Sequence, residues 1–372
     1  MFHLIFALPW AYVMARTVMP LPWDSATKLA VALVLLVASQ FHLWSRLSSG
    51  SVFNPEFPRP VVIAFNWIFG AIALLAPFQI ALDVVRLVAT IVGVGGPGPW
   101  VEARYAIAIA AFVLAALGVR QASVVPRLRD VAITVPDLPA TLDGYTLVQL
   151  TDLHISRLFP ANWTRAVVAA TNRLDVDLVV VTGDVIDGSV ASRRSGVEPL
   201  RGLTARDGVY LAPGNHEYLS GYDPWMAHLA SLGMHVLAND HAVITRGDGA
   251  LVVAGVTDPS AGGVGKPLPD LDKALEGCPP NAPIILLDHE PGRARKAAER
   301  GVAIQLSGHT HGGMIVGLDR LVARGNGGFV SGRYEVGGMT LYVNNGTGIW
   351  PGFALRLGKP SELTRITLRQ AG

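Results

Sequence analysis

The stretch DLVVVTGD, residues 177–184, decides how this chain folds. An apolar, β-branched run ends abruptly in a glycine and a carboxylate, as a buried strand does where it enters a loop. YTLVQLTD (145–152) has the same design, and so has GVYLAPGNHE (208–217). Segments typical of helices follow at 162–173 and 224–232. Strand and helix alternate as in βαβ units, which predicts an α/β fold.

Polar residues gather where the predicted strands end. HAVITRGDGALVVAGVTD is typical of a hairpin, APIILLDHEP and VAIQLSGHTHGG add two strands, and MTLYVNNGTG and ELTRITLR close the chain. The carboxyl ends of strands in such sheets collect along one edge, where ligands bind. The polar residues at these ends are Asp152, His154, Asp184, Asp187, Asn215, His216, His289, His309 and His311. Five of the ten histidines of the chain are in this set, which indicates a common task.

The composition of this set points to metal binding. His309 and His311 lie one residue apart in SGHTHGG, so an extended backbone would turn both rings to the same face. Two divalent cations about 3.5 to 4 Å apart need a bridging ligand, together with imidazoles and carboxylates that fill two shells. A mixture of imidazole, carboxylate and amide ligands suits Mn, Fe or Zn better than Ca or Mg. We therefore expect two divalent metal ions.

The first third of the chain has a different character. The whole chain is 51% apolar and only 16% charged, and the excess of apolar residues lies before about residue 119. Runs at 2–19, 29–44, 61–82 and 105–119 are each near the length that crosses a bilayer as a helix, and an extension of the third run towards Val94 is an alternative. We expect about four spans, with three or five as alternatives, in a transmembrane helical domain over residues 1–123 and a globular domain over 124–372. A cleaved signal peptide does not explain the later runs, whereas buried helices of a soluble bundle remain an alternative.

Charge and cysteine content constrain the location and the partners. An even number of spans puts the N-terminus and the globular domain on the same side of the membrane. Arg120, Arg127 and Arg129 follow the last run and slightly favour the cytoplasmic side of the cell inner membrane. Cys278 is the sole cysteine, so no intrachain disulfide forms. A net charge of +2 points to no nucleic-acid partner.

Five blocks in order resemble a known family. They are Asp152-x-His154, Gly183-Asp184-x-x-Asp187, Gly214-Asn215-His216-Glu217, an isolated His289, and Gly308-His309-x-His311. Together they look like the motif set of the calcineurin-like metallophosphoesterases, and the resemblance covers about residues 140–370. DLH, GHTHGG and YVNNGTG, preceded by membrane spans, are similar to the branch of YkuE- and YaeI-like phosphoesterases and of the transmembrane protein with metallophosphoesterase domain. The resemblance implies a two-sheet α/β sandwich.

The resemblance also implies a role for each residue. Asp152, His154 and His311 would hold one metal, and Asn215, His289 and His309 the other. Asp184 would bridge the two metals. A hydroxide shared by the metals would attack phosphorus, while His216 would stay free of metal and act as the general acid. Asp187 and Glu217 would orient a ligand or His216, or else cap turns.

The resemblance and the spans together predict a membrane-anchored phosphoric ester hydrolase. A site tethered to the bilayer favours a lipid-linked or amphipathic phosphoester or pyrophosphate, such as a phospholipid or UDP-diacylglucosamine, and hence a place in lipid metabolism. A phosphodiesterase for soluble cyclic nucleotides is an alternative, and so is a membrane sensor with a non-catalytic metal-binding module. His228, His235 and His241 are interpreted as structural, and Arg193 with Arg194 as a solvated loop.

Overall fold

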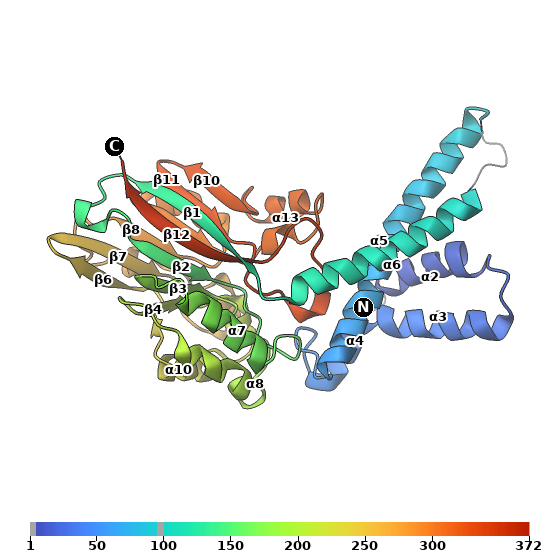
Figure 1. Cartoon of the computed structure of the whole chain (residues 1–372), viewed down its shortest axis with the longest axis horizontal. Coiled ribbons are helices and arrows are strands. Elements are labelled where there is room, and N and C mark those ends of the chain that lie inside the picture. The colour runs from blue at the N-terminus through green and yellow to red at the C-terminus, as the bar shows by residue number, and fades with distance from the viewer. Residues whose placement is uncertain (1–4, 95–99, 372) are drawn as a thin grey trace. The chain divides into compact units, whose positions relative to one another are not determined.

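The computed structural model describes residues 5–94 and 100–371 of the chain (Figure 1). Two compact units make up the chain, and the second unit comprises Ala122–Trp350 with Gly358–Gly372. The first unit comprises Met1–Gln121 and also Pro351–Leu357, a short segment from near the C-terminus. The predicted boundary at residue 123 assigned that segment to the globular domain.

The first unit is built of apolar helices. Asp24 starts one of them by accepting a hydrogen bond from the backbone N–H of Thr27 at 3.0 Å, and Pro60 lies in the first turn of another, where its fixed φ fits. Buried Met14, Leu35 and Ile72 form an apolar cluster between helices. The helical elements are α2 (Ala7–Val13), the π-helix η1 (Met14–Val18), α3 (Ser25–Ser39), α4 (Phe41–Ser49), α5 (Arg59–Ile91) and α6 (Trp100–Ser123).

Two of these helices, α5 and α6, are long and apolar enough to cross a membrane. Helices α3 and α4 meet at a bend of 57° and make a third candidate only if the pair counts as one span. The first predicted run, 2–19, begins outside the described residues, and its described part forms only α2 and η1. Within the described part of the chain there are thus two or three candidates, and the prediction of four spans is not confirmed.

A charged cluster lies among these helices. Asp83 of α5 accepts hydrogen bonds from Arg16 Nε at 2.7 Å, from Tyr12 Oη at 2.5 Å and from Arg104 Nη2 at 2.5 Å. Ionisable side chains in apolar helices are costly unless they pair with one another. The cluster therefore ties α2, η1, α5 and α6 together.

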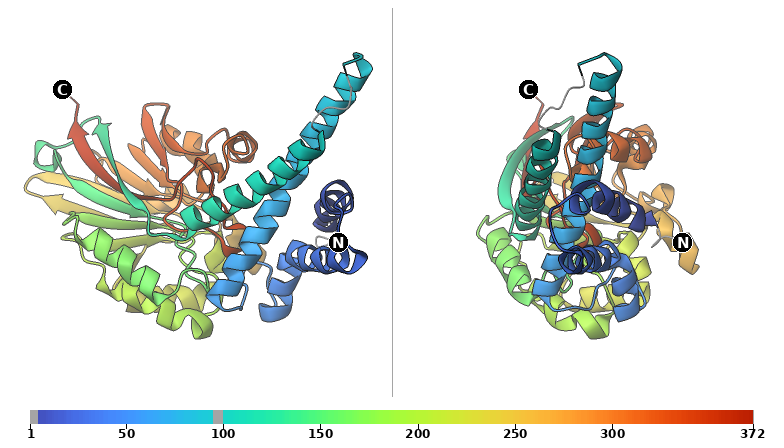
Figure 2. Two further views of the ribbon diagram at one scale, coloured as in Figure 1. Left: turned by 45° about the vertical axis from the view of Figure 1, so that its right-hand side comes forward. Right: turned by 90° about the vertical axis from the view of Figure 1, so that its right-hand side faces the viewer.

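The second unit contains two six-stranded mixed sheets (Figures 1 and 2). The strand order is β1-β12-β2-β3-β4-β5 in the first sheet and β10-β11-β9-β8-β7-β6 in the second. The strands are β1 (Arg127–Val135), β2 (Thr146–Leu150), β3 (Leu178–Thr182), β4 (Val209–Ala212), β5 (His235–Val236), β6 (Asp240–Arg246), β7 (Gly249–Gly255), β8 (Ile284–Leu287), β9 (Ile304–Ser307), β10 (Gly332–Val336), β11 (Met339–Val343) and β12 (Glu362–Gln370). Strands β2 to β5 run parallel, as do β7, β8, β9 and β11.

The core lies between the two sheets. Leu178 and Val180 of β3 share one buried cluster with Val253 of β7, while the neighbouring Val252 belongs to a second cluster on the other face of its sheet. Because side chains alternate across a strand, each strand serves both faces, which explains its continuous apolar run. This confirms the expected two-sheet α/β sandwich.

Helices complete the second unit. The predicted helices at 162–173 and 224–232 are α7 (Ala161–Asn172) and α10 (Tyr222–Ser231), and they lie with α8 (Val190–Val197) on the outer side of the first sheet (Figure 2). The predicted hairpin is the antiparallel pair β6–β7. The remaining helices are α9 (Asn215–Leu219), α11 (Leu271–Ala274), α12 (Ala294–Glu299) and α13 (Asp319–Gly325).

Candidate metal centre

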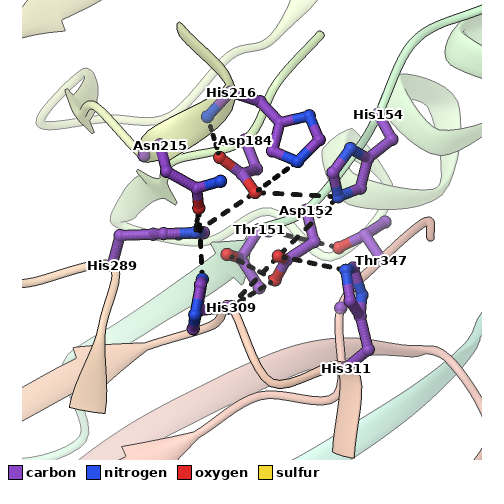
Figure 3. A network of polar contacts seen from close by, with 12 residues as sticks. Thr151, Asp152, His154, Asp184, Asn215, His216, His289, His309, His311 and Thr347 are labelled. Carbon is purple, nitrogen blue, oxygen red and sulfur yellow. Dashed lines mark hydrogen bonds and ion pairs between the residues drawn. The ribbon is translucent and has the colours of Figure 1, made fainter. Parts of the chain in front are cut away.

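Loops from both sheets bring the predicted ligands to one place (Figure 3). Strands β2, β3 and β4 of the first sheet and β8 and β9 of the second all end with one or two residues between the strand and a predicted ligand. The ligands that follow them are Asp152 and His154, Asp184, Asn215, His289, and His309 and His311. Their side chains point toward one another in Figure 3.

One group contains Asp152, His154 and His311, whose ligand atoms lie within 4.8 Å of one another. His154 Nε2 lies 3.9 Å from Asp152 Oδ1, and His311 Nε2 lies 3.8 Å from the same oxygen. Two ligands that bind one cation at about 2.1 Å lie at most about 4.2 Å apart. The spacing therefore fits a single ion shared by these three side chains.

A second group gathers around Asn215. Its Oδ1 lies 3.2 Å from His289 Nε2 and 3.1 Å from His309 Nδ1. These three side chains are the ones that the resemblance assigned to the second metal. Each offers a neutral ligand atom, so a carboxylate from another part of the chain has to balance the positive charge of a cation held here.

Asp184 lies between the two groups. Its Oδ2 is 3.8 Å from His154 Nε2 and 3.2 Å from His289 Nε2, so one oxygen faces ligands from both groups. Its other oxygen, Oδ1, accepts a hydrogen bond from the backbone N–H of His216 at 2.8 Å. This is the position that the prediction of a bridging role for Asp184 requires.

Histidine hydrogen bonds show that these residues fit a metal ion. His154 Nδ1 lies 3.0 Å from Asp187 Oδ2, and His289 Nδ1 lies 2.7 Å from the carbonyl oxygen of Thr182. In both cases Nδ1 donates, so the Nε2 lone pair points into the site. His154 Nε2 is buried and has no hydrogen-bond partner. A buried nitrogen lone pair without a partner is costly, and a cation would satisfy it.

Asp187 contacts two histidines at once. Its Oδ2 accepts from His154, and its Oδ1 lies 2.5 Å from His216 Nδ1. His216 Nε2 lies 3.9 Å from Asp184 Oδ2, so this ring edge faces the ligands. The carboxylate thus holds both rings in fixed orientations.

The Glu217 carboxylate accepts hydrogen bonds from three backbone N–H groups. Its Oε2 accepts from the backbone N–H groups of Asp184 at 3.0 Å and Gly214 at 2.7 Å, and its Oε1 accepts from that of Val185 at 2.7 Å. These groups belong to the loops that follow β3 and β4. Glu217 therefore fixes the two loops to each other.

Burial and charge oppose each other at His216. Burial lowers its pKa, but the negative charges of Asp184 and Asp187 outweigh burial and raise the pKa to about 9. At His309, burial and then the positive charge of His289 lower the pKa to about 4. The charge balance of the site thus favours protonated His216 and neutral His309 near neutral pH. Bound cations would oppose the protonation of His216.

The backbone is strained at five of the predicted ligands. Residues with positive φ include Asp152 at 51°, His154 at 45°, Asp184 at 54°, His309 at 67° and His311 at 50°. Each such residue costs of order 1 to 3 kcal/mol and persists only where the surroundings enforce it. The strain is therefore concentrated at the residues that point into the site.

Several residues that support the site escaped the sequence analysis. Thr151 donates from Oγ1 to the carbonyl of Thr182 at 2.9 Å and to Asp152 at 3.0 Å. The backbone N–H of Thr347 donates to the carbonyl of Thr151 at 2.8 Å. The glycine-rich NNGTG stretch around Thr347 was the available signal. The interpretation of Arg193 as solvated is wrong, because it is buried and its Nε donates to the Asp187 carbonyl at 2.7 Å.

Comparison with known proteins agrees with this geometry. The family profile described as calcineurin-like phosphoesterase matches residues 145–313. This range contains all five motif blocks and ends two residues after His311. Individual relatives align over more of the chain, for example 70% of it for a transmembrane protein with metallophosphoesterase domain from Bos taurus.

Two relatives and one solved structure illustrate the range of similarity. A transmembrane protein with metallophosphoesterase domain from Danio rerio is 37% identical over 70% of this chain and 61% of its own length. The uncharacterized metallophosphoesterase YkuE from Bacillus subtilis is 31% identical over 62% of this chain and 82% of its own length. A 5'-nucleotidase precursor from Thermus thermophilus has 18% identity and a TM-score of 0.37 over 60% of this chain and 55% of that one.

Proposed function

Because the chain belongs to the calcineurin-like metallophosphoesterase family, we propose that it hydrolyses a phosphoester or pyrophosphate bond with two divalent cations. The observation that carries this proposal is the position of Asp184 Oδ2 between His154 Nε2 and His289 Nε2. One carboxylate oxygen that faces two separate ligand groups suits two cations better than one. Imidazole, amide and carboxylate ligands favour Mn, Fe or Zn.

The ligands divide as the resemblance implied. Asp152, His154 and His311 would hold one cation, Asn215, His289 and His309 the other, and Asp184 both. When bound, such a pair of cations lowers the pKa of a shared water and neutralises phosphoryl oxygens. Asp187 keeps the Nδ1–H of His154 engaged, which leaves Nε2 available to the cation.

His216 supplies the proton in this proposal. A water that has released one proton to solvent would add through its oxygen to phosphorus, the bond from phosphorus to the leaving oxygen would break, and His216 Nε2 would give its proton to that oxygen and regain one from solvent. Asp187 orients the ring through Nδ1 and favours the protonated form. Glu217 acts on the loops of Asp184 and Asn215, and so it preserves geometry without moving a proton.

We further propose that the enzyme is an integral membrane protein with an amphipathic or lipid-linked substrate. Two apolar helices can span a bilayer, and relatives carry the name transmembrane protein. The aligned region covers only 61% of the Danio rerio relative, so its name does not transfer a substrate. A site on the cytoplasmic face of the inner membrane is the orientation that the arginines after the last run favour.

The test is hydrolysis of a chromogenic phosphodiester by detergent-purified protein, with and without added Mn²⁺. We expect metal-dependent turnover that Asp184→Asn abolishes, because the bridge would lose its charge. Asp143→Asn is the matched control, since this partly exposed carboxylate contacts the backbone N–H of Gln370 and lies outside the ligand set.

The outcomes separate the alternatives. Turnover that does not need metal, or that survives in Asp184→Asn, would contradict the proposed site. Two bound metals without turnover of any phosphoester would favour a sensor module. Faster turnover of soluble cyclic nucleotides than of phospholipids in vesicles would replace the lipid-linked substrate with a soluble one.

A further inference from the structure

A segment from the C-terminal part of the chain is built into the N-terminal helices. Residues 351–357, here called the hook, belong to the first unit, although the chain on either side of them belongs to the second. The hook begins with the 3-10 turn η7 (Pro351–Phe353), which lies against α5 (Figure 1). Ala354, Leu355 and Arg356 are fully buried. Nothing in the sequence pattern marked the hook as part of the helical unit.

Asn66 of α5 holds both ends of this turn. Its Nδ2 donates to the Pro351 carbonyl at 2.9 Å and to the carbonyl of Val62 in its own helix at 3.0 Å. Its Oδ1 accepts from the backbone N–H of Ala354 at 2.6 Å. The side chain is 1% exposed, so water does not replace these bonds. Without the hook, this buried amide would lose the partner of its Oδ1 and one acceptor of its Nδ2.

Two glycines make room for the hook. A Cβ on Gly70 of α5 would touch Leu355 at 3.4 Å, and a Cβ on Gly118 of α6 would approach the same side chain at 2.6 Å, too close for an unshifted contact. The carbonyl of Gly118 also accepts from the backbone N–H of Arg356 at 3.2 Å. Leu355 therefore fills a notch that α5 and α6 form together. Phe353 adds an edge-on ring contact with Phe69 at 5.9 Å between centroids.

The residues just before the hook are fixed to the metal centre. The Gly348 N–H donates to the Asp152 carbonyl at 3.0 Å, and that of Thr347 donates to the Thr151 carbonyl at 2.8 Å. A Cβ on Gly348 would overlap the carbonyl oxygen of Leu153, so the loop lies directly on this backbone. Asp152 and His154 lie on the stretch that receives these bonds, and both have positive φ. The loop thus helps to enforce a strained ligand backbone.

We infer that Asn66 is a positioning residue for the metal centre and acts through the hook. Only Ile349 and Trp350 separate Gly348, which bonds to Asp152, from Pro351, which bonds to Asn66. Three Cα steps extend at most about 11 Å, so the intervening chain has little slack. Release of the hook from α5 and α6 removes a restraint on the loop that holds Asp152. The metal centre then depends on the packing of two apolar helices, and this inference rests on the proposed metal binding.

The test compares Asn66→Leu with the wild-type full-length chain in lipid nanodiscs. Mn²⁺ affinity is measured by titration, and the exchange-coupled signal of a manganese pair is recorded by electron paramagnetic resonance. We expect about a tenfold weaker affinity for at least one ion and a changed pair signal, the range found when residues that orient metal ligands are lost. Gly118→Ala should act in the same direction, because it crowds Leu355 while leaving Asn66 intact.

The matched control is Gln79→Leu. Gln79 is also a fully buried amide of α5, but it bonds to Arg104 and not to the hook. If Gln79→Leu weakens Mn²⁺ binding as much as Asn66→Leu does, the effect is general destabilisation and the inference is wrong. The inference is also wrong if Asn66→Leu and Gly118→Ala both bind Mn²⁺ with wild-type affinity and show an unchanged manganese-pair signal. Failure of the wild-type chain to bind Mn²⁺ would instead refute the proposed function.

Discussion

Asp187 accepts hydrogen bonds from His154 and His216 through different oxygens. In Asp187→Asn one of these oxygens becomes an NH₂ group, which cannot accept from an imidazole N–H. One ring must then change tautomer or turn. We expect metal affinity or kcat to fall about 10- to 100-fold, as found for groups that orient metal ligands. Mn²⁺ titration and phosphodiester turnover measure the two effects separately.

Asp177→Asn serves as the control for Asp187→Asn. Asp177 is also largely buried, but it precedes β3, whereas the metal centre follows β3. The phosphodiester turnover and the Mn²⁺ affinity of Asp177→Asn should stay near those of the wild type at temperatures where the protein is folded. Unchanged values in Asp187→Asn as well would mean that neither histidine depends on this carboxylate.

Gly308 lies where no side chain fits. A Cβ at this position would overlap Thr151 Oγ1 and Asp152 Oδ2. Gly308→Ala should therefore lower stability by about 1 to 3 kcal/mol, the usual cost of overpacking, and weaken Mn²⁺ binding through Asp152. Thermal unfolding and metal titration measure both.

Gly263→Ala is the comparison for Gly308→Ala, because a Cβ there would meet nothing within 4 Å. Gly263→Ala should change neither the thermal stability nor the Mn²⁺ affinity. Equal effects of the two substitutions would show that the close approach of Gly308 to Asp152 is unimportant.

The candidate ligands could be named from the sequence, whereas the residues that support them could not. Five ordered blocks gave the ligand set because strand ends and metal chemistry constrain residue type. Thr151 and Arg193 act through backbone carbonyls, and such contacts need no particular sequence pattern. The roles of the ligands stay predictions until metal binding is measured.

Among the elements, β6 and β3 are linked across the two sheets by Arg246. This arginine donates to Asp177 at 3.0 Å and to Asp207 at 2.8 Å, and it lies 5.1 Å from the centre of the Tyr145 ring. Arg246→Met should reduce stability at neutral pH by about 2 kcal/mol, since hydrogen bonds to charged groups are lost. Urea unfolding measures the difference.

The pH dependence of that difference has a definite sign. Burial acts to raise the pKa of Asp177, but hydrogen bonds from Thr146 and Arg246 bring it below its ordinary 3.8. A lowered pKa in the folded state gives stability above the unfolded pKa, and this stability is lost as pH falls through the folded value. The difference in the free energy of unfolding between wild type and Arg246→Met should therefore have its full size at about pH 7 and become smaller below about pH 4.

Arg206→Met is the matched control, because Arg206 bonds to the same carboxylate with a side chain that is 65% exposed. Arg206→Met should lower the free energy of unfolding much less than Arg246→Met does, since solvent screens exposed ion pairs. If the difference in the free energy of unfolding between wild type and Arg246→Met stays constant as the pH falls, the role assigned to the Asp177 carboxylate is wrong.

Element types were predictable, but their lengths in the first unit were not. Periodicity and strand-end residues located α7, α10 and the β6–β7 hairpin within two residues. The apolar run at 61–82 continues to Ile91 as α5, in line with the alternative extension towards Val94, because Asp83 finds partners in Arg16 and Arg104 and does not end the helix. Partners so distant in sequence leave no local signal.

At the scale of the whole molecule, metal removal tests whether the centre holds the fold together. A ligand at 100 times its Kd stabilises the folded state by about 2.7 kcal/mol. Cations should also relieve the proximity of buried Asp152 and Asp184. We expect a chelator to lower Tm by several degrees and added Mn²⁺ to restore it, as followed by tryptophan fluorescence. An equal shift in Asp184→Asn would place the stabilising ion elsewhere.

The division into units was the least predictable feature. A boundary near residue 123 follows from hydropathy, and the two units do part between 121 and 122. Residues 351–357 return to the helices because Asn66, Gly70 and Gly118 form a matching notch. Three isolated residues of ordinary type do not reveal that match. The domain limits and the number of spans stay predictions.

The hook also fixes an order of events during translation. Gly118 leaves the ribosome 233 residues before Pro351 (351 − 118 = 233). At about 5 to 20 residues per second, α5 and α6 wait on the order of ten to fifty seconds for Leu355. During this interval the notch between α5 and α6 lacks Leu355, and the loop on Asp152 is not yet tied to Asn66 through the hook. A chain that stops before residue 351 would therefore lack the restraint that the hook places on the Asp152 loop.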